Sequence, residues 1–488
     1  MSDNPTAGLK PEILWQRFYE ISRVPRPSKK EGKIIEHMRS LLKELNISFK
    51  EDKVGNIVAF VPATKGYEKA PTVVLQGHVD MVCEKNKGNK HDFDNDPIIL
   101  KKENGWITAD GTTLGSDNGI GVAAGLAVIS DKNVIHGPLE ILMTIDEETG
   151  LTGANNLERG FITGKILLNL DSEEDGTFYV GCSGGLDTLA SFNIENEIAA
   201  RGTEAYDLIV SGLKGGHSGL DINTNRANAI KILARALKAI EKFNYSVAKI
   251  EGGSKRNAIP REAEAVVLIA PNDEKEIVKI INELQANLLN EFKTSDSGLK
   301  LEFKKSDYKS DKIFNHSFTK NILNTLLALP HGVIAMSQDI PNLVETSTNV
   351  ATIFTNDGVV TIGTSQRSSI ESAKRYVANS VTAVFNLAGA KIETGDRYPG
   401  WKPDLDSKIL NLSKKVYEDI FKKEPEIKAI HAGLECGILG DKEPGLDMVS
   451  FGPTIEGAHS PDERVNIETV EKFYRLLKGI LKKVAEGN

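Results

Sequence analysis

Residues 73–80 read Val-Val-Leu-Gln-Gly-His-Val-Asp, an apolar run that ends on a histidine and a carboxylate. The apolar part predicts a buried strand. In extended backbone His78 and Asp80 lie on one face, because strand side chains alternate with a period of two. An imidazole beside a carboxylate suits a metal ligand held by an orienting acid. For this pair alone, a surface loop that happens to contain both residues is the better explanation, so the metal interpretation needs further ligands.

Such ligands occur where other predicted strands end or a predicted helix begins. Glu148 follows the apolar run 139–145, Asp171 follows the run 165–170, and Asp117 stands in a Gly-Ser-Asp-Asn-Gly turn at a helix start. With His78 and His459 they form a set of oxygen and imidazole donors without a thiolate, which suits zinc, manganese or cobalt. Two divalent ions about 3.5–4 Å apart need a bridging carboxylate and a few terminal ligands each. The sequence supplies enough residues for both.

Glu147 and Glu148 are adjacent, so they do not easily serve the same role. We expect extended backbone here, on which the two side chains point in opposite directions. One of them then binds metal while the other faces a water molecule.

The predicted elements place these residues at one edge of a sheet. Predicted strands at 57–60, 72–75, 139–145 and 165–170 alternate with helices at 11–23, 31–45 and 120–130. The spacing of Ser28 and Glu31 resembles a capping box at the start of the second helix. Strands that alternate with helices predict an α/β domain with a largely parallel or mixed sheet. In such sheets, ligands bind at the carboxyl ends of the strands.

The pattern changes near residue 186 and returns near residue 400. Between them we predict two consecutive α+β units, and afterwards helices at 405–422 and 467–484 with strands at 426–430 and 447–451. We therefore predict a catalytic domain formed by residues 1–185 and 395–488, with a domain at 186–394 inserted into it. The joints are expected near Gly184-Gly185 and Thr394-Gly395.

Composition narrows the class of protein. The 488 residues include 60 Lys and Arg and 68 Asp and Glu, a net charge of −8, and no basic block is present, which argues against nucleic acid as a partner. Cys83, Cys182 and Cys436 are too few for a disulfide framework and favour a reducing compartment. The longest apolar run is too short to span a bilayer, and the start of the chain does not resemble a signal peptide. We expect a soluble cytoplasmic protein with no membrane partner.

Six motifs, in chain order over nearly the whole sequence, resemble the co-catalytic zinc aminoacylase/carboxypeptidase family, and within it the Xaa-His (aminoacyl-histidine) dipeptidase branch. The resemblance implies an α/β dinuclear-metal exopeptidase domain with an inserted α+β lid. The motifs are Gly-His-Val-Asp-Met-Val, Leu-Gly-Ser-Asp-Asn-Gly-Ile-Gly, Asp-Glu-Glu-Thr-Gly-Leu-Thr-Gly-Ala, Leu-Asp-Ser-Glu-Glu, Gly-Gly-His-Ser-Gly and His-Ser-Pro-Asp-Glu.

The resemblance also assigns roles to the residues that match. It implies two divalent ions per chain, most readily Zn²⁺, with Co²⁺ or Mn²⁺ as alternatives. Asn118 departs from much of the family, which has a second acid at that position. The implied roles are His78 and Asp171 as ligands of one ion, Glu148 and His459 as ligands of the other, Asp117 as the bridge, Asp80 as the acid that orients His78, and Glu147 as the general base.

Further residues are expected to contact the substrate. By resemblance, His217 stabilises the oxyanion. Arg367 has the geometry to bind the C-terminal carboxylate of a peptide, and Asn257 to add a polar contact, although a structural hydrogen bond explains either residue nearly as well. Glu435, in His-Ala-Gly-Leu-Glu-Cys-Gly, is expected to line the pocket. Cys83 and Cys436 lie near motifs but lack the base arrangement that a thiol nucleophile needs, so a cysteine hydrolase is not favoured.

The leading hypothesis is a metal-dependent dipeptidase that prefers Xaa-His dipeptides. The same site could instead remove an acyl group from amino acids or trim tripeptides, and a non-catalytic binding protein with this fold is a separate class. The resemblance implies a homodimer and a lid that brings His217 and Arg367 to the metals on closure. Alternatively, the two units of the inserted domain pack together and mimic that pairing within one chain.

Overall fold

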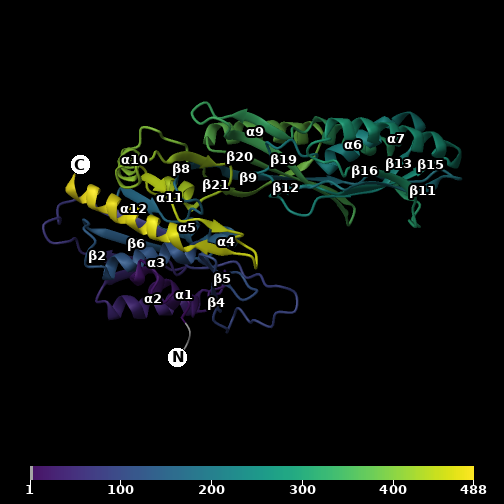
Figure 1. The fold of residues 1–488 in the computed structure, drawn as a ribbon. Coiled ribbons are helices and arrows are strands. Elements are labelled where there is room, and N and C mark those ends of the chain that lie inside the picture. The colour runs from purple at the N-terminus through teal and green to yellow at the C-terminus, as the bar shows by residue number, and fades with distance from the viewer. Residues whose placement is uncertain (1–3, 488) are drawn as a thin grey trace. The chain divides into compact units, whose positions relative to one another are not determined.

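The computed structural model describes residues 4–487 and divides into two compact units. Unit 1 comprises the chain up to Gly181, Pro403–Ala429 and the chain from Leu434 onward. Unit 2 comprises Cys182–Lys402 and Ile430–Gly433 (Figure 1). Unit 2 therefore starts at Cys182 rather than at residue 186, ends at Lys402 rather than at residue 394, and takes in a short return segment that we did not predict.

Unit 1 contains an eight-stranded mixed sheet, as the sequence predicts. Its four central strands, β6, β3, β7 and β23, are parallel to one another, whereas β1, β2 and β8 pair antiparallel. Every residue of β3 and β6 is buried, as expected for central strands covered by helices on both faces. In sheet order the strands are β1 (Ser48–Glu51), β2 (Ile57–Val61), β6 (Leu139–Thr144), β3 (Val73–His78), β7 (Ile166–Asn169), β23 (Asp447–Ser450), β8 (Thr177–Cys182) and β22 (Glu426–Ile430).

Helices pack against this sheet, and α12 contacts the end of α3, where the Tyr474 hydroxyl donates to Asp131 at 3.3 Å. Helix α3 is rich in Gly and Ala because it packs closely: a Cβ at Gly121 would lie 2.4 Å from the carbonyl oxygen of Leu170. The helices of unit 1 are α1 (Glu12–Ser22), α2 (Gly32–Glu44), α3 (Ser116–Ser130), α4 (Glu147–Gly150), α5 (Thr152–Asn156), α10 (Lys408–Phe421), α11 (Glu435–Lys442) and α12 (Ile467–Glu486). A smaller sheet contains β4 (Leu100–Glu103), β5 (Trp106–Ala109), β24 (Ile455–Glu456) and β25 (Arg464–Asn466).

The predicted capping box before α2 is wrong. Neither Ser28 nor Glu31 caps the helix with its side chain. Ser28 instead donates to the Asp80 carboxylate at 2.8 Å, and Glu31 accepts from the backbone N–H groups of Lys29 and Asp146. The polar groups of both residues are directed toward the end of β3 rather than toward the helix.

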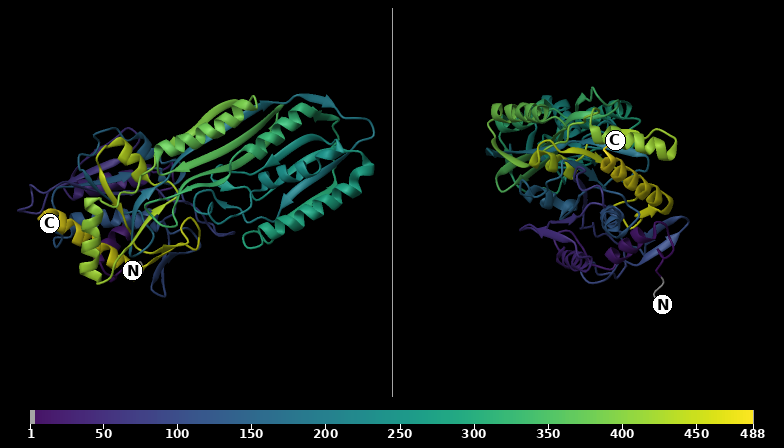
Figure 2. Two further views of the ribbon diagram at one scale, coloured as in Figure 1. Left: turned by 90° about the horizontal axis from the view of Figure 1, so that it is seen from above. Right: turned by 90° about the vertical axis from the view of Figure 1, so that its left-hand side faces the viewer.

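Unit 2 is built on one nine-stranded sheet, with α6, α7 and α9 on the same face of it (Figures 1 and 2). The two predicted α+β units are halves of this sheet, joined where β13 pairs with β19, and one core draws on helices of both halves. The strands in order are β16 (Lys300–Lys305), β11 (Glu204–Ser211), β15 (Ala263–Ile269), β13 (Ser246–Gly252), β19 (Val344–Asn356), β20 (Val359–Ser368), β9 (Gly184–Asn193) and β21 (Lys391–Tyr398), with β18 (Gly332–Met336) paired to β19.

The remaining elements of unit 2 are short ribbons and helices. Two ribbons pair β10 (Asn196–Ile198) with β17 (Lys312–Phe314) and β12 (Gly216–His217) with β14 (Ala258–Ile259). The helices are α6 (Ala229–Ala239), α7 (Glu274–Glu291), α8 (His316–Ala328) and α9 (Glu371–Leu387), with 3-10 turns at Glu241–Phe243 and Pro271–Asp273.

Glycines stand at both of the joints predicted near residues 184 and 394. They lie in β9 and β21, which pair antiparallel. A Cβ at Gly184 would lie 2.5 Å from the backbone nitrogen of Gly400, and one at Gly185 would lie 2.4 Å from the ring of Tyr398. These glycines permit a close approach of backbone and ring.

Within residues 4–487, no helix has the length and apolar character needed to cross a membrane.

Candidate active site

Asp117 lies between two histidines in unit 1. Its Oδ1 is 3.2 Å from Nε2 of His78, and its Oδ2 is 3.1 Å from Nε2 of His459. His78 Nε2 also lies 3.4 Å from Asp171 Oδ1, and His459 Nε2 lies 3.0 Å from Glu148 Oε2. The five residues expected as metal ligands therefore form two groups that share one carboxylate.

Strand ends bring these ligands together. His78 is the last residue of β3, Asp171 follows β7, and Glu148 follows β6 in the turn α4. These three strands are adjacent and parallel, so their carboxyl ends meet at one edge. Asp117 comes from the first turn of α3, and His459 from the loop between β24 and β25.

The donor set fits two metal ions. One group joins His78, Asp117 and Asp171, the other Asp117, Glu148 and His459, and in each the three ligand atoms lie within 4.8 Å of one another. Oε1 of Glu148 and Oδ1 of Asp171 are buried and accept no hydrogen bond within the chain. Buried carboxylate oxygens of this kind need a partner, and a divalent cation held by imidazole and carboxylate supplies one.

Burial and mutual hydrogen bonds shift the pKa values of these residues. Hydrogen bonds to Asp117 and Glu148 raise the pKa of His459 to about 11. Burial raises the pKa of Asp171 to about 7. Burial also opposes ionisation of Asp117, but hydrogen bonds from His459 and His78 outweigh it and lower its pKa. Without a cation the site therefore retains protons on its ligands, and cation binding must release them.

Asp80 connects His78 to the turn that bears the two glutamates. It is fully buried, and its Oδ1 lies 3.2 Å from Nδ1 of His78. The backbone N–H of Glu147 donates to Oδ1 at 3.1 Å and that of Glu148 to Oδ2 at 3.3 Å. A carboxylate at the start of a helical turn is favourably placed for these donors. Asp80 thus holds one ligand ring and orients the backbone of a second ligand.

The extended backbone expected at Glu147 and Glu148 is wrong. Asp146 adopts left-handed geometry (φ 46°, ψ 48°), and Glu147–Gly150 form the helical turn α4. The turn forms because the carboxylate of Asp80 accepts its first N–H groups. One ligand atom each from His78, Glu147 and Glu148 still lie within 4.8 Å of one another. Burial raises the pKa of Glu147 well above its usual value, as expected for an acid–base group.

Two residues that shape the Asp117 loop were not predicted from the sequence. Glu463 is 2% exposed and accepts hydrogen bonds from the backbone N–H groups of Gly115 and Ser116 at 2.9 and 2.7 Å, and from that of Asp117 at 3.3 Å. Buried Arg26 donates to the carbonyl oxygens of Val79, Asp80 and Gly115. Glu463 ends the His-Ser-Pro-Asp-Glu motif, which was the available signal, but its partners lie far away in sequence.

In unit 2, the hydrogen bonds of His217 fix its tautomer. Its Nδ1 accepts the backbone N–H groups of Gly219 and Leu220 at 3.2 and 3.1 Å, so a neutral ring carries its proton on Nε2. Burial and the charge of Arg367 lower the pKa of His217 to about 4. At neutral pH the ring is therefore an uncharged Nε2–H donor, as oxyanion stabilisation requires.

The other residues expected to contact substrate differ in their surroundings. Arg367 is 6% exposed and donates to Ser218 and Tyr398 at 3.3 and 2.8 Å. Asn257 is exposed, and its backbone carbonyl accepts the backbone N–H of Ser218 at 2.9 Å. Glu435, in unit 1, is fully buried and bonds to other side chains, which does not fit a side chain that touches substrate.

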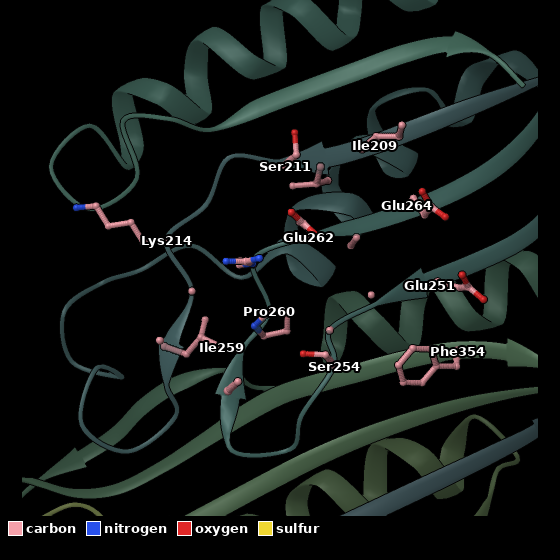
Figure 3. Close-up of a pocket in the computed structure, with 18 residues that line it drawn as sticks. Ile209, Ser211, Lys214, Glu251, Ser254, Ile259, Pro260, Glu262, Glu264 and Phe354 are labelled. Atoms are coloured by element: carbon pink, nitrogen blue, oxygen red, sulfur yellow. The ribbon is translucent and has the colours of Figure 1, made fainter. Parts of the chain in front are cut away.

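A cavity of about 900 Å³ lies in unit 2 beside the ribbon β12–β14 (Figure 3). Its wall includes Lys214, Glu251, Glu262 and Glu264. Glu262 and Glu264 are exposed, and the cavity wall has no cluster of metal-binding side chains among the described residues. We assign the chemistry to the cluster around Asp117.

Comparisons with known proteins identify the family of the chain. The profile of peptidase family M20/M25/M40 matches residues 74–483. The cytosol non-specific dipeptidase of Escherichia coli (strain K12) is 42% identical over 478 residues, 98% of either chain.

Two solved structures also resemble this chain. The chain resembles the aminoacylhistidine dipeptidase of Vibrio alginolyticus with a TM-score of 0.89 and 41% identity over 98% of this chain and 97% of that one. The aminopeptidase PepT of Bacillus cereus, with a TM-score of 0.58 and 20% identity over 98% and 99% of the two chains, shares the fold. The chain belongs to peptidase family M20/M25/M40.

Proposed function

We propose that this chain is a two-metal dipeptidase that hydrolyses the peptide bond of dipeptides and prefers Xaa-His. The observation that carries the proposal is the position of Asp117, whose two carboxylate oxygens lie 3.2 and 3.1 Å from the imidazoles of His78 and His459. A carboxylate shared between two His-containing groups is the arrangement that a two-ion hydrolase needs.

His78 and Asp171 would hold one ion, Glu148 and His459 the other, and Asp117 would bridge them. Zn²⁺ is the ion we favour, with Co²⁺ or Mn²⁺ as alternatives, because imidazole and carboxylate suit all three. When bound, the ions would lower the pKa of a water molecule toward neutrality and polarise the scissile carbonyl. Asp80 keeps the His78 ring oriented through Nδ1, at 3.2 Å.

Glu147 is the proposed general base. Its carboxylate lies beside those of the ligand groups, and burial raises its pKa. In the proposed reaction Glu147 takes a proton from the attacking water and later delivers it to the amine that leaves. A raised pKa makes both transfers accessible near neutral pH.

Unit 2, which the sequence predicted as residues 186–394, is proposed to act as an inserted lid that supplies substrate contacts. The Nε2–H of His217 would donate to the developing oxyanion, and Arg367 would bind the C-terminal carboxylate of the dipeptide. Asn257 would add a polar contact.

Location and assembly are proposed from the relatives and the resemblance. We infer a cytoplasmic protein, since its E. coli relative is called a cytosol dipeptidase, and a homodimer. Light scattering tests the assembly, and a monomer at micromolar concentration would contradict it.

A substrate panel tests the proposal. Metal-stripped and zinc-restored protein would be assayed with Xaa-His dipeptides, other dipeptides, N-acetyl amino acids and tripeptides. We expect zinc to restore cleavage of dipeptides, with Xaa-His cleaved fastest. If only N-acetyl amino acids react, or only tripeptides, the proposed metal site would stand but dipeptides would be the wrong substrate class.

A further inference from the structure

A chain of buried polar side chains crosses the sheet of unit 1 just before the metal ligands. Ser450 donates to Asn169 at 2.5 Å, Asn169 donates through Nδ2 to Gln76 at 2.5 Å, and Gln76 donates through Nε2 to Oε2 of Glu435 at 2.5 Å. Thr144 donates to the same oxygen of Glu435 at 2.7 Å. All five residues are 0% exposed.

Backbone register places these hydrogen-bonded side chains two residues before the proposed metal ligands on the same strands. Gln76 pairs with Asn169, and Asn169 pairs with Ser450, so the three side chains stand next to one another on adjacent strands. Gln76 precedes His78 by two positions, and Asn169 precedes Asp171 by two. Thr144 ends β6, which leads into the turn α4.

The hydrogen bonds all point toward Glu435. Each amide uses its oxygen as the acceptor on one side and its nitrogen as the donor on the other, so the chain must end on a group that only accepts. Oε2 of Glu435 is that group, because it takes both Gln76 and Thr144. Oε1 of Glu435 is buried and has no hydrogen-bond partner. Without an acceptor at this position, Gln76 would keep only its longer bond to Thr144 at 3.3 Å, and Thr144 only its longer bond to the carbonyl of Gly77 at 3.4 Å.

Resting on the proposed function, we propose that Glu435 is a positioning residue for the metal ligands. Its carboxylate ends the hydrogen-bonded chain across β6, β3, β7 and β23 and thereby fixes the strand ends that present His78, Glu148 and Asp171. The effect on metal binding is indirect, since Glu435 itself contacts Gln76 and Thr144. Residues that hold metal ligands in place typically change metal affinity or activity about 10–100-fold when they are replaced.

This role differs from the substrate contact expected from the sequence, and the two roles predict different kinetics. A substrate contact affects KM and leaves metal affinity unchanged. A positioning residue changes metal affinity and kcat, with KM little affected. The conservative replacement Glu435→Gln retains an oxygen that can accept from Gln76 and Thr144, whereas Glu435→Leu has a similar volume and no acceptor.

The test compares four variants with the wild type. Zn²⁺ and Co²⁺ affinities are measured by competition with a chromophoric chelator, which requires no activity, and kcat and KM are measured on an Xaa-His dipeptide. Glu435→Leu and Glu435→Gln change the acceptor. Thr144→Val removes one donor with little change of shape and serves if Glu435→Leu does not fold. Thr188→Val is the matched control, because it removes a buried hydroxyl that bonds to Gln366 at 3.0 Å in unit 2.

We expect Glu435→Leu to lose about 10–100-fold in metal affinity, with KM within about threefold of wild type. Glu435→Gln should stay within about threefold in affinity, because its amide oxygen still accepts both donors. Thr144→Val should lose less affinity than Glu435→Leu but more than Thr188→Val, which should lose none.

Unchanged metal affinity in folded Glu435→Leu or in Thr144→Val would overturn the proposal. So would a rise in KM alone, or equal losses in Glu435→Leu and Glu435→Gln, which would assign the effect to charge. If the wild type binds two ions and cleaves no dipeptide, the proposed function fails, and the metal affinities still decide the role of Glu435.

Discussion

The backbone N–H of Glu147 donates to the Asp80 carboxylate at 3.1 Å, which joins the proposed general base to the residue that orients His78. The same carboxylate accepts the N–H of Glu148 at 3.3 Å and the hydroxyl of Ser28 at 2.8 Å. One buried acid thus organises a metal ligand from β3 and two acids from the turn after β6. The chemistry of this site depends on Asp80 although it need not touch substrate.

Replacing Asp80 should therefore weaken metal binding and catalysis together. Asp80→Asn keeps one acceptor oxygen, but its amide nitrogen cannot accept a backbone N–H or pair with Nδ1–H of His78. We expect a loss of about 10–100-fold in Zn²⁺ affinity or in kcat. Ser28→Ala, which removes only one of the hydrogen bonds, is the control and should show a smaller loss. Wild-type affinity and kcat in Asp80→Asn would show that His78 needs no orienting acid.

Metal binding should release protons. At pH 7 the metal-free site carries a proton on His459, whose pKa is raised to about 11 by its hydrogen bonds to Asp117 and Glu148, and a share of one on Asp171, whose pKa burial raises to about 7. His78 is also protonated: burial opposes its charge, but the charge of Asp171 and hydrogen bonds to nearby carboxylates outweigh burial and raise its pKa well above its usual value. Because bound ligands must be deprotonated, affinity should rise with pH. Titration calorimetry in buffers of different ionisation enthalpy should report about two to three protons released at pH 7. Affinity that is independent of pH between 6 and 8 would contradict this protonation scheme.

His217→Ala should lower kcat without changing metal affinity. The neutral Nε2–H of His217 is the donor proposed for the oxyanion, and removal of one such donor typically costs about 10²–10³ in kcat. Because the pKa of His217 is lowered to about 4 by burial and Arg367, the wild-type kcat should show no inflection near pH 6.5 from this ring. An unchanged kcat in His217→Ala would remove the residue from the mechanism.

His331 should make the stability of unit 2 depend on pH. Burial lowers its pKa from 6.5 to about 4, and its Nδ1 lies 3.4 Å from the Asn228 amide nitrogen. Between pH 4 and 6.5 the unfolded chain therefore binds the additional proton, and stability rises with pH.

The replacement His331→Asn keeps an acceptor and does not titrate, so it should gain about 1–2 kcal/mol relative to wild type at pH 5 and nothing at pH 7.5. Denaturant unfolding at the two pH values measures this difference. His316→Asn, at an exposed position of α8, is the control. Equal pH dependence in wild type and His331→Asn would contradict the burial argument.

The proximity of the proposed metal ligands was predictable because each stands in a local pattern. His78 and Asp171 follow apolar strands, and parallel strands end at a common edge, so spacing along the chain implied their proximity. Glu463 and Arg26 were not predictable, since their partners are backbone groups of distant segments. Glu435 was placed near substrate because its segment resembles a loop, whereas it is buried among Gln76 and Thr144.

The parts of the fold that were not predicted also depend on contacts between distant segments. Six strands of the nine-stranded sheet were predicted, whereas β9, β16 and β21 were not. β9 and β21 were missed because their glycines were interpreted as joints between domains. Gly184 and Gly185 instead allow Tyr398 and Gly400 to approach closely. The single sheet formed by both halves of unit 2 depends on the pairing of β13 with β19, a long-range contact that no local pattern encodes.

The most direct test of the central claim is the rate at which Glu147→Gln cleaves an Xaa-His dipeptide, measured with the metal content of the same sample. Glutamine keeps the backbone N–H that donates to Asp80 and removes the group that accepts a proton. We predict two bound ions per chain, as in the wild type, and a kcat lower by about 10²–10⁴. A wild-type rate in Glu147→Gln with both ions bound would contradict the account.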